Sequence, residues 1–244
     1  MKTVVTSLVV FVCVFGGGLL GMALRGALPE HHRSLESKEL IRLTMALIGT
    51  MSALVLGLLV ASAKGNYDSK REALTSASAN LLMLDRILAH YGPETVTART
   101  TLKQAVVEVA DAIWREEGRS PARFDSIYDS ISELVPKTDR QRSLQTQATN
   151  LILDLGRSRW LLFARSGSSI STPLLVIVVF WLTINFVSFG LFASRNPTVL
   201  AALFVGALSV AGAVYIILEM DSPFRGLLRI SEAPMRTVVE QMGH

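Results

Sequence analysis

Charged residues and cysteine are scarce in this sequence of 244 residues. Asp, Glu, Lys and Arg together make up 18% of the chain, and half of the chain is hydrophobic. In a soluble domain, about a quarter of the residues are usually charged. This composition therefore excludes an ordinary soluble protein and indicates an integral membrane protein. The single cysteine, Cys13, cannot form a disulfide within the chain, and it therefore leaves the redox compartment open.

The sequence also lacks the short motifs of common active sites. It contains no P-loop, no GxSxG elbow, no HExxH helix and no set of Cys and His residues at metal-ligand spacing. The net charge is +4, but the basic residues are not interleaved with aromatic residues that would stack on bases. We therefore predict neither an enzyme nor a nucleic-acid-binding protein, and we expect no metal and no cofactor.

The apolar run over residues 43–63 is the clearest membrane signal in the chain. It holds 21 residues without a charge. A helix of that length rises about 31 Å, which matches the hydrocarbon core of a bilayer. The run ends where a basic, polar segment begins at Lys64. These features predict a transmembrane helix over residues 43–63.

Three further apolar runs predict transmembrane helices over residues 3–24, 173–193 and 198–218. The first run follows Met1-Lys2 as in a signal peptide, but it is longer than a usual apolar region and lacks a convincing cleavage site, so we predict a retained helix. Gly17 and Gly21 leave one of its faces without side chains. That face favours close packing of another helix, and a hinge or a groove along a pore is the alternative.

The stretch between the second and third runs is polar and periodic. Apolar residues recur at helical or heptad spacing in four segments, over about 66–91, 94–117, 121–135 and 138–165. We therefore predict an all-α integral membrane protein with four transmembrane helices and a cytoplasmic helical domain inserted between the second and third. Its parts are residues 1–63 with helices 1 and 2, 64–171 with the inserted domain, 172–218 with helices 3 and 4, and 219–244 with a cytoplasmic tail.

The distribution of basic residues predicts the orientation. With four spans, both termini and the inserted domain share one side, which carries 19 Lys and Arg residues, while the opposite side carries five. Positively charged flanks stay in the cytoplasm, so we predict a multi-pass protein of the cell (inner) membrane with both termini cytoplasmic. The expected partner of such a protein is the lipid bilayer.

Several polar residues interrupt or flank the apolar runs. Asn185 lies inside the third run, where an unpaired amide is costly, so we predict that it faces protein or water, either in an interhelical hydrogen bond or on a permeation path. His31 and His32 fit a solvated loop, and a metal-binding or pH-sensing role is the alternative. We predict structural roles near the membrane surface for Asp85, Arg86, Glu219, Asp221 and Arg225.

Five stretches spread over nearly the whole chain carry a further signal. They are Leu28-Pro29-Glu30-His31-His32, residues 53–64, Leu84-Asp85-Arg86 with Tyr91-Gly92-Pro93-Glu94, Trp181 with Phe189-Gly190-Leu191-Phe192, and residues 218–226. In this order they resemble the bestrophin-like membrane domain family of bacteria and plants, which is remotely similar to bestrophin anion channels. The resemblance implies four membrane helices, a cytoplasmic helical domain and, by analogy, a pentameric anion channel with its pore lined by the second helix.

The sequence departs from bestrophins at two points. Animal bestrophins bind calcium through an acidic run just after the fourth span, whereas this chain offers only Glu219 and Asp221 there. Residues 43–63 also contain no aromatic residue that would match the constriction of a bestrophin neck.

By this resemblance we expect an oligomeric, anion-favouring ion channel, whose partners are the lipid bilayer, further copies of the chain and inorganic ions. One mainly apolar face of the second helix would form a throat that gates by dewetting, and rings of basic residues below it would favour anions. The pore-lining candidates are Thr44, Ile48, Met51, Val55 and Leu58 or Leu59, and the candidates for the electrostatic rings are Lys64, Lys70 and Arg71. The alternative is a non-conducting membrane scaffold or sensor that binds partners through its amphipathic helices, above all the seam over residues 67–91. In that case the same residues of the second helix are ordinary packing residues.

Overall fold

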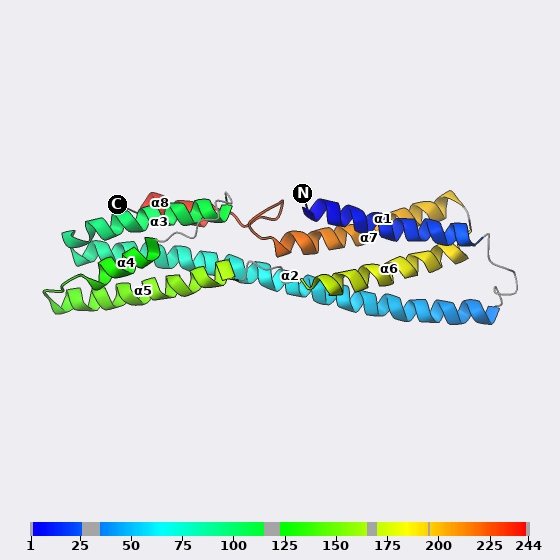
Figure 1. The fold of residues 1–244 in the computed structure, drawn as a ribbon, viewed down its shortest axis with the longest axis horizontal. Coiled ribbons are helices and arrows are strands. Elements are labelled where there is room, and N and C mark those ends of the chain that lie inside the picture. The colour runs from blue at the N-terminus through cyan, green and yellow to red at the C-terminus, as the bar shows by residue number, and fades with distance from the viewer. Residues whose placement is uncertain (1, 26–34, 115–122, 165–169, 195, 243–244) are drawn as a thin grey trace. The chain divides into compact units, whose positions relative to one another are not determined.

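The computed structural model describes residues 2–25, 35–114, 123–164, 170–194 and 196–242. All regular secondary structure in these ranges is helical, which confirms the predicted all-α fold (Figure 1). The loop with His31 and His32 lies outside the described residues. In chain order the elements are α1 (Lys2–Leu24), α2 (Leu35–Tyr91), the 3-10 turn η2 (Pro93–Thr95), α3 (Val96–Trp114), α4 (Arg123–Ser132), α5 (Asp139–Ala164), α6 (Thr172–Phe192), α7 (Pro197–Asp221) and α8 (Ala233–Gln241).

Four helices are long and apolar enough to cross a membrane. Each of them contains one of the apolar runs found in the sequence, and the chain is therefore a membrane protein. The side of the membrane on which each connecting segment lies remains a prediction. By length and composition, the four candidate spans are Thr3–Leu24, Glu39–Tyr91, Thr172–Phe192 and Pro197–Asp221.

Helix α2 continues without a break for 57 residues. It joins the predicted transmembrane helix to the amphipathic helix that follows, because the intervening Lys64-Gly65-Asn66 contains no proline and one glycine costs a helix only about 1 kcal/mol. The helix ends at Tyr91. There Gly92 has a φ of 142°, and Pro93 has no backbone N–H to extend the hydrogen-bond ladder.

The chain divides into two compact units. Unit 1 comprises Met1–Asn66 and Ser168–Ser222, and unit 2 comprises Tyr67–Gly167 and Pro223–His244. Each unit contains a hydrophobic core of its own. Helix α2 contributes its first part to unit 1 and its second part to unit 2, and unit 1 holds the whole of α1, α6 and α7.

In unit 1, helix α1 packs against α6 and α7. The approach of α1 to α6 is so close that a side chain at Gly21 would overlap the Val187 carbonyl oxygen, and one at Gly190 would overlap the Gly18 carbonyl oxygen. Glycine allows two helix backbones to touch in this way. A Cβ atom at Gly17 would also press on α6, so the predicted packing face of the first helix is confirmed.

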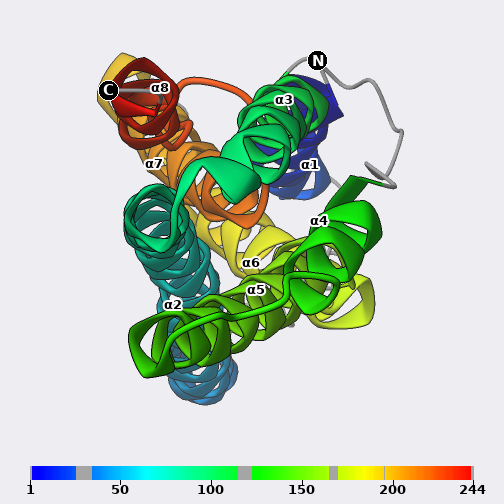
Figure 2. The same ribbon diagram turned by 90° about the vertical axis from the view of Figure 1, so that its left-hand side faces the viewer.

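Unit 2 gathers the second part of α2, together with α3, α4, α5 and α8, around one core (Figure 2). The heptad residues Leu74, Leu81, Leu84 and Leu88 of α2 are buried there. This burial explains the amphipathic pattern seen in the sequence, because the apolar seam faces helices of the same chain.

The segment that follows α7 is fixed to α3. The indole N–H of Trp114 donates a hydrogen bond to the Ile230 carbonyl at 3.1 Å. Nearer the start of α3, the Lys103 ammonium donates to the Met242 carbonyl at 2.8 Å. The Trp114 ring also meets the Phe224 ring edge-on, with 6.1 Å between the centroids. These contacts make the segment part of unit 2.

Candidate functional site

The apolar part of α2 is the least covered of the four candidate spans. Of its most apolar stretch, 11% is buried, compared with 28% to 33% for the other three. Within unit 1 it is covered mainly along one stripe, where Ser52, Leu59 and Ala63 are buried. The rest of its circumference is open in a single chain. The large side chains that α2 exposes there are Leu43, Leu47, Met51, Leu54, Leu58 and Val60.

The predicted pore-lining residues lie along the border between the covered stripe and the open face. Thr44, Met51 and Leu58 are exposed, and Ile48 and Val55 are half-buried. Leu59 differs from them, because it is only 2% exposed and belongs to the core of unit 1. Of the two alternatives at this level, Leu58 is therefore the residue on the open side.

A row of small residues also lies on the open face, and the sequence analysis did not single it out. Its members are spaced three or four positions apart, which places them on one side of the helix. A Cβ atom at Gly57 would meet nothing within 4 Å in a single chain. Small residues at this spacing let a second helix approach closely, so the spacing itself was the available signal. The row consists of Ala46, Thr50, Ala53, Gly57 and Ala61.

The basic residues below the apolar part of α2 differ in exposure. Lys64 and Arg71 are exposed, whereas Lys70 is only 8% exposed. Lys70 is the residue that interrupts the heptad seam, and it lies one turn before Leu74, which is fully buried. Its position on the covered face makes it a poor candidate for a charged ring, while Lys64 and Arg71 are exposed and lie on the same side of the helix as Gly57.

Asn185 lies in the interior of unit 1 and is 4% exposed. It therefore faces protein, in agreement with one part of the prediction. Its amide N–H donates to the Trp181 carbonyl of the same helix at 3.0 Å, so the hydrogen bond is within α6 and not between helices. Its Oδ1 atom lies 3.7 Å from the place where a Cβ atom of Gly49 would be, which puts the side chain beside α2.

Asp85 forms an ion pair in unit 2, and its partner is Arg99 of α3. Arg86, which follows Asp85 directly in the sequence, has an exposed side chain. The hydrogen bond with Asp85 raises the pKa of the Arg99 guanidinium, burial opposes this effect and the negative charge of the carboxylate adds to it. The pair joins two helices and gives no sign of a chemical role.

The remaining polar candidates lie at and after the end of α7. Glu219, in the last turn of the helix, is 4% exposed, Asp221 is half-buried and Arg225 is exposed. Within the described ranges, three or more His, Cys, Asp or Glu side chains nowhere gather closely enough to hold a metal ion.

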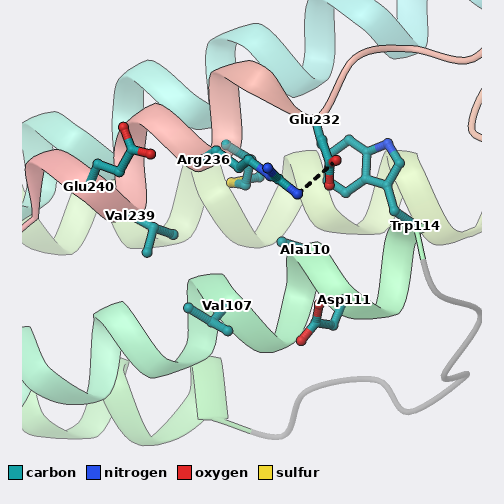
Figure 3. A pocket seen from close by; sticks show the side chains of 9 residues that line it. Val107, Ala110, Asp111, Trp114, Glu232, Arg236, Val239 and Glu240 are labelled. Carbon is teal, nitrogen blue, oxygen red and sulfur yellow. Dashed lines mark ion pairs between the residues drawn. The ribbon is translucent and has the colours of Figure 1, made fainter.

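A pocket of about 210 Å³ lies in unit 2 between α3 and α8. Figure 3 shows its apolar side chains on both helices and the ion pair on its rim, where Arg236 Nη2 lies 3.0 Å from Glu232 Oε1. The ionisable side chains in its lining are Asp111, Glu232, Arg236 and Glu240. The residues that line it are Val107, Ala110, Asp111, Trp114, Glu232, Met235, Arg236, Val239 and Glu240.

Four apolar helices and a helical unit with its own core define an all-helical membrane protein. A family model, described as Bestrophin-like domain, matches residues 12–235 of this chain. The chain belongs to the bestrophin-like family. Neither the search of curated proteins nor that of solved structures found a match.

Proposed function

We propose that this protein is an oligomeric ion channel that favours anions, with its pore lined by the membrane part of α2. The observation that carries the proposal is the open surface of α2. The other three candidate spans pack on one another in a single chain, whereas most of the circumference of α2 is left for contacts outside that chain. Family membership supports the same function by analogy with bestrophin channels.

Two kinds of surface on α2 support an oligomer. The row that includes Gly57 is suited to close contact with a helix of a neighbouring copy. The border that carries Met51 and Leu58 is apolar and exposed, as the throat of a pore that gates by dewetting requires. A ring of copies would place one surface between neighbours and the other toward the axis, and the analogy suggests five copies.

Charge supports a preference for anions. Lys64 and Arg71 are exposed on α2 directly after its apolar part. Repeated around an axis, they would raise the local concentration of anions at one mouth of the pore. The same excess of basic residues supports an orientation with both termini and unit 2 in the cytoplasm, and a location in the cell membrane.

A non-conducting scaffold is the second candidate, and one observation bears on it. The seam that would join two scaffold chains includes Leu74, Leu81 and Leu88, and these side chains are buried in the core of unit 2. The seam is thus occupied within the chain. A scaffold would need other surfaces, of which the exposed Met83 and Val96 are examples.

The test combines native mass spectrometry with ion flux on one preparation. The full chain is purified in detergent, its mass is measured, and the same sample is reconstituted into vesicles loaded with chloride or with potassium. We expect a pentamer and chloride release that exceeds potassium release, with protein-free vesicles of the same lipids as the control. A monomer or dimer that releases neither ion overturns the proposal and leaves the scaffold.

A further inference from the structure

A short loop after α7 presents two leucines between two arginines. The backbone N–H of Ile230 donates to the Pro223 carbonyl at 2.7 Å, which closes the loop at its base. Gly226, with a φ of 81°, provides the turn that a residue with a side chain rarely adopts. The residues between the two ends are Phe224, Arg225, Gly226, Leu227, Leu228 and Arg229.

The base of this loop is packed and its tip is exposed. Ile230 is 5% exposed, and Phe224 packs on the Trp114 ring, so both ends are held against α3. By contrast, Leu227 is 83% exposed, which is the highest value among the large hydrophobic side chains that the structure describes. Leu228 is 43% exposed. Together, the two adjacent leucines form a small apolar tip on a loop that is held at both ends, and an apolar partner would cover this tip.

The position of the loop in the chain identifies that partner. Helix α7, a candidate membrane span, ends at Asp221. Leu227 follows six residues later, so even a fully extended chain would carry it only about 20 Å from the end of the helix. The polar interface of a bilayer extends several ångströms beyond the hydrocarbon core. The loop is therefore tethered close to a lipid surface by the chain itself.

The charges of the tip fit the same partner. Arg225 and Arg229 flank the leucines, and both are exposed. Arginine binds phosphate groups through its planar fork, and anionic phospholipids attract basic residues near the membrane surface. A short segment that combines leucines with arginines matches the two requirements of interfacial binding, an apolar insert and a cationic rim.

We propose that residues 223–230 form a membrane-surface anchor. In it Leu227 and Leu228 insert into the interface of the bilayer, and Arg225 and Arg229 bind the phosphates of anionic lipids. The anchor requires only that α7 spans the membrane, so it stands whether or not the protein conducts ions.

Site-specific fluorescence quenching in vesicles tests the anchor. In a Cys13→Ser background of the full chain, Leu227→Cys is labelled with an environment-sensitive fluorophore and reconstituted into vesicles of phosphatidylcholine, with or without phosphatidylglycerol. Val135→Cys is the matched control, because Val135 is also in unit 2 and is 79% exposed. Leu228→Cys replaces Leu227→Cys if the first variant does not assemble as the parent does.

We expect lipids with a nitroxide on the upper acyl chain to quench the label at position 227 strongly, and aqueous iodide to quench it weakly. The label at position 135 should show the reverse pattern. Arg229→Gln should reduce the inserted fraction about fivefold in vesicles with phosphatidylglycerol and leave it unchanged in pure phosphatidylcholine, since one basic residue contributes about that factor at an anionic surface.

Two outcomes overturn the anchor. Iodide quenching at position 227 equal to that at position 135 would place the loop in water. A label at position 227 that is shielded from both quenchers would place it against protein, for which a second copy of the chain is the first candidate. Both results are independent of chloride flux, which is measured separately.

Discussion

Arg99 holds both carboxylate oxygens of Asp85, with its Nε atom 2.8 Å from Oδ1 and its Nη2 atom 2.9 Å from Oδ2. Such a two-point contact fixes the angle between the side chains as well as their distance. Asp85 is 4% exposed, and the pair connects α2 to α3 inside unit 2. We predict that Asp85→Ala lowers the free energy of unfolding by about 3 kcal/mol, because it leaves the guanidinium without its partner.

The measurement is thermal unfolding of the purified protein in detergent, compared with the double variant Asp85→Leu, Arg99→Met. Because the double variant removes both charges, we expect it to be more stable than Asp85→Ala alone. Equal losses in the single and double variants would show that packing, and not the ion pair, determines the effect.

Two adjacent leucines on α2 provide a matched pair. Leu59 is 2% exposed and Leu58 is 63% exposed. Leu59→Ala should cost about 2 to 4 kcal/mol because it opens a cavity in the core of unit 1. Leu58→Ala should leave stability nearly unchanged and alter chloride flux, since a smaller side chain widens an apolar throat. Unfolding in detergent and flux in vesicles distinguish the two effects, and unaltered flux in Leu58→Ala would remove this residue from the pore.

The close contact between α1 and α6 makes a glycine pair informative. A Cβ atom at Gly190 would overlap the backbone of Gly18, whereas one at Gly16 would meet nothing within 4 Å. We predict that Gly190→Ala separates the two helices and lowers the unfolding temperature and the yield. Gly16→Ala should be neutral or stabilising by up to about 1 kcal/mol, because alanine favours a helix more than glycine does. Equal behaviour of the two variants would contradict the contact.

A charge reversal tests the basic ring. Lys64→Glu should reduce the permeability of chloride relative to potassium by up to a factor on the order of ten, because it reverses the charge at the mouth of the pore. The observable is the reversal potential in a bilayer recording at low salt, where screening is weak. Arg140→Glu on α5 is the control, because Arg140 is exposed in unit 2 and lies outside the proposed ring. Unchanged reversal potentials in both variants would count against an anion pore at this position.

Removal of two buried hydroxyl groups near the end of α2 should change the free energy of unfolding in opposite directions. The Tyr91 hydroxyl is buried without a hydrogen-bond partner. The Thr95 hydroxyl donates to the Leu88 carbonyl and lies 2.8 Å from the Gly92 carbonyl. Tyr91→Phe should therefore maintain or raise the free energy of unfolding, by up to about 1 kcal/mol, and Thr95→Val should lower it by about 1 to 2 kcal/mol. Thermal unfolding compares them, and a large loss in Tyr91→Phe would reveal a partner for that hydroxyl.

The periodicity of apolar residues was sufficient to predict most of the helices. The residues at the helix ends explain where the helices stop. The seam of α2 is a helical pattern because Leu74, Leu81 and Leu88 lie on one face, and the structure buries that face. Gly92 and Pro93 directly follow the last residue of α2, and each of them opposes continued helix for its own backbone reason. These features depend on neighbours within one turn, which the sequence displays directly.

Contacts between helices were not predictable in the same way. Asp85 pairs with Arg99, which is 14 residues away, and no local rule selects that arginine over Arg86. Leu58 and Leu59 were left as alternatives because neighbouring positions differ by about 100° on a helix, and only the packing of unit 1 decides which of them is covered. Lys70 interrupted the seam in the sequence, and its burial followed from the helices that surround it.

Unit 2 is assembled from two separated pieces of the chain, and this has a consequence for biogenesis. Residues 67–167 leave the ribosome before α6 and α7, and the segment with Ile230 and Met242 leaves after them. The hydrogen bonds that Trp114 and Lys103 of α3 donate to this late segment therefore cannot form until both late membrane helices have been synthesised. During that interval the side of α3 that packs against α8 is left uncovered. The core of unit 2 can therefore be completed only after all of the membrane helices have been made.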